Sequence, residues 1–209
     1  MNKTEPPDPA LKRTRNDMTL EEVLEVWIPY RLQAIETLRF AWDWMDESDE
    51  PRAVEVMCDG KVKLRGNVAA VANPMVEVGI IHARALLEFL GLCVSQGMLS
   101  QIAYRRDDDI AVEHYSTPLH PLEKVSPAAA IASYMGPPNE AGSSLVAIFE
   151  FANKGLAHLT TGLQVGKYTD LHLDIACRGI PVLLHNYLYA KLGRTIPHPP
   201  TAPAENDVG

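Results

Sequence analysis

The stretch NPMVEVGIIHARALLEFLGLCVSQ, residues 73–96, decides the fold that the sequence predicts. Apolar side chains cover most of a helical circumference here, and Asn73-Pro74 supplies an N-cap followed by a first-turn proline. Four titratable residues interrupt the stretch: Glu77, His82, Arg84 and Glu88. Because such interruptions are costly in lipid, the stretch predicts the central helix of a soluble bundle and no membrane span.

An earlier helix is predicted just after the N-terminal segment. Thr19 and Glu22 stand at capping-box spacing, in which each side chain satisfies an amide of the first turn. Apolar residues at intervals of three or four then continue to Met45, as on the buried face of a helix. Pro29 interrupts this pattern, and we expect it to bend the helix.

A β-hairpin is predicted between these two helices. Asp59-Gly60 separates two runs in which apolar and polar residues alternate. A two-residue turn of this kind requires positive φ at both central positions, which Asp and Gly tolerate well. We therefore expect a small hairpin at about residues 53–65, inserted into a helical protein.

Further helices are expected over residues 110–115, 128–134, 144–160 and 169–192, the last with a kink at Pro181. The fold class is therefore mainly α, a helical bundle of about four to five main helices with one hairpin insertion. We expect one domain over residues 18–194. Residues 1–17 and the Pro-rich residues 195–209 are expected to form disordered tails.

The composition argues against several classes of function. The 209 residues carry a formal net charge of −8, which opposes broad binding to phosphate backbones or anionic lipid. The three cysteines form no CxxC pair, and residues 1–17 have no apolar core typical of a secretion signal. We expect a reduced, cytoplasmic protein without a membrane segment.

The two long helices carry candidate binding residues. Arg31 falls on the apolar stripe of the first helix, so it either belongs to a charged site inside the bundle or extends past Pro29 into water. Arg84 and Glu88 are four residues apart and form either one wall of a cleft or an ion pair at the helix edge. His82 points the opposite way, among apolar neighbours, and is expected to be a hydrogen-bonded core histidine.

The later helices carry candidate proton-transfer groups. Glu150, Lys154 and His158 are four apart in succession, so they share a face of the predicted helix, with Asn153 beside them. That face is either a solvated surface or a cationic site in which His158 titrates near neutrality. Three residues of the last helix form a similar stripe near Pro181: Asp174, Arg178 and His185.

Motifs for metals and cofactors are missing from the sequence. No HxxxH, no HExxH and no Cys/His pair at ligand spacing occurs. The sequence also contains no glycine-rich phosphate loop, no GxSxG elbow and no dinucleotide-binding fingerprint. We therefore expect neither a metal ion nor another cofactor, although ligands assembled from separate helices would escape this test.

Three segments carry a family resemblance. ARALLEFLG (83–91), DDDIAVEHY (107–115) and NKGLAHLT (153–160) together resemble a group of bacterial helical proteins. The last segment is also similar to the motif region of HEPN domains, which are helical bundles that often form homodimers. Members of that superfamily are metal-independent ribonucleases or toxins, or inactive modules that bind RNA or nucleotides. The resemblance covers about half of the chain.

The resemblance implies a specific chemistry. The HEPN motif is an Arg, commonly followed by a polar residue, with a His a few positions later; His158 matches the His and Asn153 the polar residue. An RNA 2′-hydroxyl would attack the adjacent phosphate, with His158 as general base or acid and Asn153 orienting the substrate. No Arg stands in the motif window. Lys154 is the nearest cation, so Arg84 or Arg31 would supply the guanidinium from another helix.

Three functions stay open on the sequence. The first is a non-catalytic module that binds a protein partner or regulates it, which the acidic surface and the missing Arg favour. The second is a HEPN-like homodimer that cleaves RNA or binds RNA or nucleotides. The third is a small-molecule or metal site inside the bundle, built from Arg31, Arg84 and Glu88 with His158 or His185.

Overall fold

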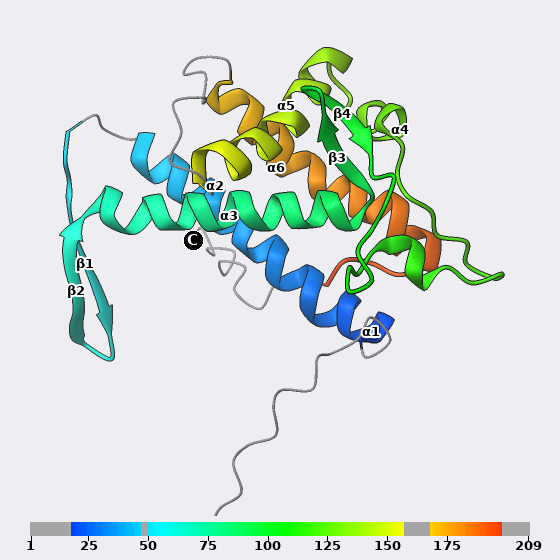
Figure 1. The fold of residues 1–209 in the computed structure, drawn as a ribbon. Coiled ribbons are helices and arrows are strands. Elements are labelled where there is room, and N and C mark those ends of the chain that lie inside the picture. The colour runs from blue at the N-terminus through cyan, green and yellow to red at the C-terminus, as the bar shows by residue number, and fades with distance from the viewer. Residues whose placement is uncertain (1–17, 47–49, 157–167, 198–209) are drawn as a thin grey trace, which may run out of the picture.

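The computed structural model describes residues 18–46, 50–156 and 168–197. The fold is mainly α, with two small antiparallel sheets of two strands each, as Figure 1 shows. The first helical segments are α1 (Leu20–Glu22), the π-helical turn η2 (Val23–Trp27) and α2 (Ile28–Asp46), followed by β1 (Ala53–Cys58), β2 (Lys61–Asn67) and α3 (Val68–Phe89). The later elements are β3 (Leu92–Ser95), β4 (Met98–Gln101), the 3-10 helix η3 (Val112–Tyr115), α4 (Pro127–Ala132), α5 (Pro138–Glu150), the π-helix η4 (Phe151–Leu156), α6 (Asp170–Leu184), the π-helix η5 (His185–Tyr189) and the 3-10 helix η6 (Ala190–Leu192). Most of the two predicted tails, residues 1–17 and 198–209, lies outside the described residues.

The first helix begins as predicted and accommodates its proline through a π-helical turn. The Thr19 amide donates to the Glu22 carboxylate at 2.9 Å, and the Glu22 amide donates to the Thr19 hydroxyl at 3.1 Å. In η2 the Ile28 amide donates to the Val23 carbonyl, five residues back. Pro29 has no amide to offer the next carbonyl, that of Leu24, and the buried Tyr189 hydroxyl donates to it instead at 2.6 Å.

The predicted start of the central helix at Asn73-Pro74 is wrong. Asn67 is the N-cap of α3, since its side chain accepts the Ala70 amide at 2.8 Å. Pro74 lies inside the helix but near its N-terminal end. A proline at that depth removes only one helical hydrogen bond, so the helix continues through the Asn-Pro pair that the prediction took for its start.

The predicted end of that helix near residue 96 is also wrong. Gly91 adopts φ +95° directly after α3, and its amide donates to the Glu88 carbonyl at 2.9 Å, which ends the helix. The following residues form the β3–β4 hairpin, which the sequence analysis read as helix and loop. Its turn, Gln96-Gly97, has positive φ at both positions. Cys93 consequently lies in β3 and not in a helix.

The β1–β2 hairpin and the short helix expected over residues 128–134 are confirmed. Asp59 and Gly60 have φ +51° and +72°, the backbone that the predicted turn requires. The Ser126 side chain accepts the Ala129 amide at the start of α4. By contrast, α5 begins at Pro138 and not at residue 144, because Pro138 fits the first turn of a helix, where its missing amide costs no hydrogen bond.

One hydrophobic core joins the helices. α2 packs along α3, and α5 packs along α6; α3 also contacts both α5 and α6, and Figure 1 shows α5 and α6 on one side of α3. Gly79 lets α2 and α3 approach closely, because a Cβ there would stand 2.9 Å from the Ala34 carbonyl oxygen. The largest fully buried core side chains include Ile35, Leu38, Leu86, Leu87, Ile148, Ile180 and Tyr189.

The central helix is less enclosed than its apolar sequence predicts. Among the described residues, α3 is the one helix long and apolar enough to cross a membrane, by length and composition alone. Only 39% of its most apolar window is buried, although α3 contacts α2, α5 and α6. Val78 and Ile81 face solvent, so one side of the helix is apolar and uncovered.

Candidate functional site

A cavity of about 840 Å³ opens between the first helix, the C-terminal half of α3 and the loop after β4. Three of the predicted binding residues line it: Arg31 from α2, and Arg84 and Glu88 from α3. Aromatic rings of Trp27, Phe89 and Tyr104 share the wall, with Cys93 and the loop residues Ile102–Arg106 and Asp108–Ile110. The fold therefore brings together charged residues that lie far apart in the sequence.

Arg31 contributes a guanidinium without an ion-pair partner. Its Cζ lies 4.4 Å from the centre of the Trp27 ring, and its Nη1 donates to the Trp27 carbonyl at 3.4 Å. Within residues 18–46, 50–156 and 168–197, no carboxylate forms a salt bridge with it. Partial burial lowers the pKa of Arg31 below its ordinary value, because the charged form loses hydration. Arg31 is therefore half-buried and borders the cavity.

Arg84 and Glu88 form the predicted ion pair on α3. The Arg84 Nε donates to the Glu88 carboxylate at 2.9 Å, and its Nη2 lies 2.9 Å from the same oxygen. The Arg84 Nη1 also donates to the side-chain oxygen of Asn153, in η4. A guanidinium from α3 therefore contacts the polar residue of the 153–160 segment.

His82 differs from its prediction. The ring is half-buried, but it makes no hydrogen bond to any of the residues described by the structure. It packs edge-on against Tyr30, with ring centres 5.1 Å apart. Burial lowers the pKa of His82, and the nearby Arg31 charge lowers it further, so the neutral form is favoured.

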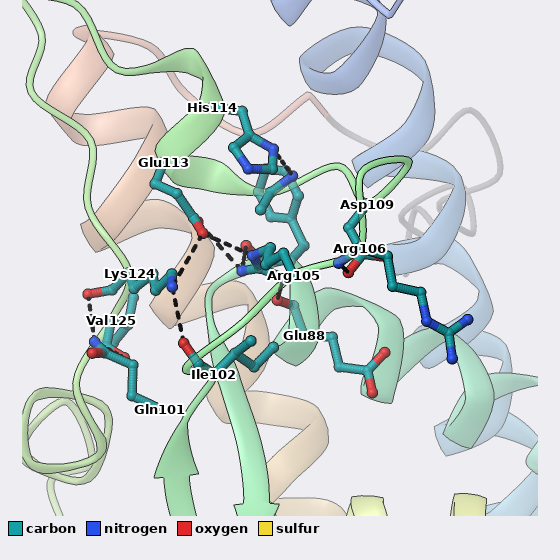
Figure 2. Close-up of polar contacts among 12 residues, drawn as sticks. Glu88, Gln101, Ile102, Arg105, Arg106, Asp109, Glu113, His114, Lys124 and Val125 are labelled. Atoms are coloured by element: carbon teal, nitrogen blue, oxygen red, sulfur yellow. Dashed lines mark hydrogen bonds and ion pairs between the residues drawn. The ribbon is translucent and has the colours of Figure 1, made fainter. Parts of the chain in front are cut away.

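A buried ion pair holds the loop that forms the far wall of the cavity (Figure 2). The Arg105 Nε donates to the Glu113 carboxylate at 2.7 Å, and its Nη1 donates to the Glu88 carbonyl at the end of α3 at 2.9 Å. The side chains of Arg105 and Glu113 are 8% and 21% exposed. Burial alone would raise the pKa of Glu113, but the Arg105 hydrogen bond and charge outweigh it and hold that pKa below its ordinary value.

Further hydrogen bonds tie the same loop to its neighbours. The Lys124 ammonium donates to the Ile102 carbonyl at 2.9 Å and lies 3.8 Å from Glu113. The Gln101 side chain donates to the carbonyls of Lys124 and Val125. Figure 2 shows Arg105 directed at Glu113, whereas the Arg106 side chain extends away from it. The cavity wall is therefore positioned by polar contacts that leave a second arginine on its surface.

These loop residues were not predicted from the sequence. The Asp109 carboxylate accepts the Arg106 amide at 2.9 Å and turns the chain before the helix expected over residues 110–115. The helix itself is only the 3-10 turn η3. The pair Arg105-Arg106, followed eight residues after Arg105 by Glu113, was the available signal. Only the folded chain shows that Arg105 is buried and Arg106 is exposed.

The predicted proton-transfer face lies mostly outside what the structure describes. α5 ends at Glu150 and the chain continues as the π-helix η4, in which hydrogen bonds span five residues and not four. Residues four apart therefore no longer stack as in an α-helix. Asn153 is exposed and contacts Arg84; Lys154 lies in η4. His158 lies outside the described residues.

The stripe on the last helix separates into a pair and a single residue. The Arg178 Nε donates to the Asp174 carboxylate at 2.8 Å, and Asp174 also lies 3.6 Å from the Arg39 Nε, which links α6 to α2. His185 is exposed and begins η5, and within the described part of the chain it forms no hydrogen bond or ion pair with either residue. None of the three lines the cavity beside Arg31.

The cavity lining offers charged and aromatic groups. The described lining residues supply guanidiniums, carboxylates and aromatic rings, but no histidine or lysine. Burial first, and then the Glu88 charge, raises the pKa of the Cys93 thiol, so the thiolate is disfavoured at neutral pH. Within the described residues, no group of three or more His, Cys, Asp or Glu side chains is placed to hold a metal ion.

Comparison with known proteins adds no assignment. No protein-family model, no curated protein and no solved structure matches the chain. The geometry of the cavity therefore carries the functional proposal.

Proposed function

We propose that this protein is a non-catalytic regulatory module that binds a small organic anion, of the nucleotide class, in the cavity between α2, α3 and the loop after β4. The observation that carries the proposal is the Arg31 guanidinium, which borders a cavity of about 840 Å³ and has no carboxylate partner among the described residues. Cavities of about 300–1,000 Å³ suit small molecules and cofactors.

The lining supports an anion with a planar group. A half-buried cation without a counter-ion gains most from a ligand that brings negative charge, and Arg binds phosphate with paired donors. Trp27, Phe89 and Tyr104 add aromatic surface for a planar base. Glu88 and the Asp108–Asp109 carboxylates provide acceptors for amino or hydroxyl groups and disfavour a ligand that carries phosphates alone.

The test is direct binding of defined probes. Adenosine monophosphate, guanosine monophosphate and inorganic phosphate are titrated into the full chain by calorimetry. We expect a nucleotide to bind and to lose at least about tenfold in affinity in Arg31→Ala, the loss typical of one charged hydrogen bond. Arg178→Ala, an exposed arginine outside the cavity, is the matched control and leaves binding unchanged. Equal binding by wild type and Arg31→Ala, or no binding by wild type, contradicts the proposal.

A second candidate function is a metal-independent endoribonuclease. The observation that favours it is the hydrogen bond from Arg84 to Asn153, because it brings a guanidinium to the segment that resembles the HEPN motif. In this candidate His158 acts as general base or acid, Lys154 and Arg84 stabilise phosphate charge, and Asn153 orients the RNA.

RNA cleavage separates the two candidates. The second predicts cleavage of single-stranded RNA in the presence of EDTA, lost in His158→Ala and reduced in Arg84→Ala. The first predicts no cleavage by the wild-type chain. Cleavage that persists unchanged in His158→Ala would come from a contaminant and would reject the ribonuclease candidate.

A further inference from the structure

A second cavity, of about 440 Å³, lies between α4, α5 and α6. Its described lining residues and those of the cavity beside Arg31 do not overlap, so the two cavities are separate. The lining is mainly apolar, and it includes Leu171 and Val182 of α6, whose side chains are 57% and 42% exposed. A concave apolar surface of this volume is typical of a site for a small molecule.

A glycine in the interior of α6, Gly179, forms part of this lining. Glycine weakens a helix interior relative to alanine, so a helical glycine calls for a packing reason. Gly79 of α3 has one, because a Cβ there would stand 2.9 Å from the Ala34 carbonyl oxygen. At Gly179, by contrast, the described chain places no heavy atom within 4 Å of the Cβ position, apart from the adjoining backbone and its two neighbours. The space against this part of α6 is therefore open to another molecule.

The charged side chains at this cavity already have opposite partners. Among the described lining residues the ionised side chains are Asp174 and Arg178, and the Arg178 Nε donates to the Asp174 carboxylate at 2.8 Å. Outside the lining, the Arg39 guanidinium lies 3.6 Å from Asp174 and 3.7 Å from Glu36. An ionic ligand would have to compete with these pairs, so the lining favours an uncharged one.

The two hydroxyl groups of the lining already donate their protons. The Ser133 Oγ donates to the Ala129 carbonyl at 3.0 Å, and the Tyr134 hydroxyl donates to the Glu140 carboxylate at 3.4 Å. Each hydroxyl oxygen therefore offers lone pairs, which accept a hydrogen bond. A ligand with a hydroxyl or amide donor can pair with them, whereas a carboxylate, which only accepts, cannot.

We propose that the cavity between α4, α5 and α6 binds an uncharged, mainly apolar small molecule that carries a hydroxyl or amide donor, of the class of medium-chain alcohols. The apolar part of the ligand covers Leu171 and Val182 and lies against the open backbone at Gly179. Its donor pairs with the Ser133 or Tyr134 oxygen. This site goes beyond the nucleotide site proposed above and does not depend on it, because the two linings are separate.

The first experiment compares three ligands that share one alkyl chain and differ in charge: decanol, decanoate and decylammonium. Each is titrated into the full chain by calorimetry at neutral pH. We expect decanol to bind with a Kd below about 100 µM, and at least about tenfold more tightly than either ion. A wild-type chain that does not bind decanol overturns the site. Equal or tighter binding of an ion overturns the uncharged class.

Gly179→Leu tests the location of the site, since it adds a side chain where the chain leaves open space. We expect the variant to fold, because leucine favours a helix more than glycine does, and to bind decanol at least about tenfold more weakly. Ala70→Leu, at an exposed position of α3 outside this lining, is the matched control and leaves binding unchanged. Equal decanol binding by wild type and Gly179→Leu overturns the site.

Val182→Lys tests the charge argument without relying on Gly179. The lysine adds a positive charge to the lining at a position that is already exposed, so decanoate should gain at least about tenfold in affinity relative to decanol. An unchanged preference for decanol overturns the charge argument. If a second copy of the chain covers the cavity, wild type will not bind decanol and Gly179→Leu will change the sedimentation of the protein, which also overturns the proposal.

Discussion

The two β-hairpins of this protein share the same turn geometry and differ in almost everything else. Asp59-Gly60 and Gln96-Gly97 both adopt positive φ at two successive residues. β3–β4 packs against α3, α4 and α5, and its Leu92 is completely buried. The main contact of β1–β2 with the described helices is its junction with α3. Turn residues therefore decide that a hairpin forms, and packing decides whether it belongs to the core.

Two ion pairs show the same difference. Arg105–Glu113, beside β3–β4, and Arg65–Glu55, within β1–β2, both have an N–O distance of 2.7 Å. The first pair is largely buried, whereas the side chains of the second are 73% and 50% exposed. Water and salt weaken an exposed pair, and burial makes the loss of one partner costly. Two ion pairs with the same N–O distance are therefore expected to contribute unequally to the free energy of unfolding.

The largest expected effect is truncation of a buried hairpin side chain. Leu92→Ala should lower the free energy of unfolding by about 3 kcal/mol, because it removes apolar burial and leaves a cavity. Leu64→Ala, the matched change in the exposed hairpin, should cost less than about 0.5 kcal/mol in the monomer. Urea unfolding of dilute protein, followed by circular dichroism, measures both. Similar losses would mean that the two hairpins are equally packed.

The next effect is loss of the buried ion pair. Glu113→Gln leaves the Arg105 guanidinium buried without its counter-charge, and we expect a loss of about 3 kcal/mol or slightly less. Glu55→Gln, in the exposed pair, should change stability by less than about 0.5 kcal/mol. The same urea titrations compare them. A loss in Glu55→Gln as large as that in Glu113→Gln would reject the role of burial.

Acid should reproduce part of the Glu113→Gln effect. The pKa of Glu113 is lower in the folded chain than its ordinary value of 4.5, so the ionised carboxylate contributes stability above that value. This contribution is lost as the pH falls through the folded pKa. The difference between wild type and Glu113→Gln should therefore be constant near neutrality and narrow below about pH 4.5. A difference that stays constant down to about pH 3 contradicts this expectation.

The smallest expected effect comes from replacing the glycine in the turn of each hairpin. Gly97 and Gly60 have φ +76° and +72°, so an Ala at either position meets similar backbone strain of about 1 kcal/mol. Gly97→Ala should lower the global free energy of unfolding by about that amount, because β3–β4 unfolds with the core. Gly60→Ala should leave global unfolding almost unchanged and raise only the hydrogen-exchange rates of β1–β2. Identical urea midpoints for the two variants would show that both hairpins unfold together.

Local signals predicted part of the fold correctly. The Thr19–Glu22 capping box and the Asp59-Gly60 turn depend on residues close to one another in sequence, and both were confirmed. The ends of the central helix were wrong at both sides. Pro74 resembles a helix start wherever it stands, and Gly91 ends α3 inside a run of apolar residues that would suit either a helix or a strand.

The candidate site was predicted in its residues but not in its arrangement. Arg31, Arg84 and Glu88 were identified because charges interrupt apolar stripes, and the fold places all three on one cavity. The loop wall held by Arg105 and Glu113 was missed, since the sequence does not show which of two adjacent arginines is buried. The Glu150–Lys154–His158 face stays a prediction, because His158 lies outside the described residues, although the π-helix η4 changes the hydrogen-bond spacing after Glu150.

The sequence by itself determined the elements that depend on neighbouring residues: helix caps, the hairpin turn, and the apolar stripes that make the protein mainly helical. The tertiary structure alone decided which charges meet, which hairpin is buried and where α3 stops. The physical reason is that caps and turns are satisfied within a few residues, whereas burial and charge pairing depend on segments that are distant along the chain.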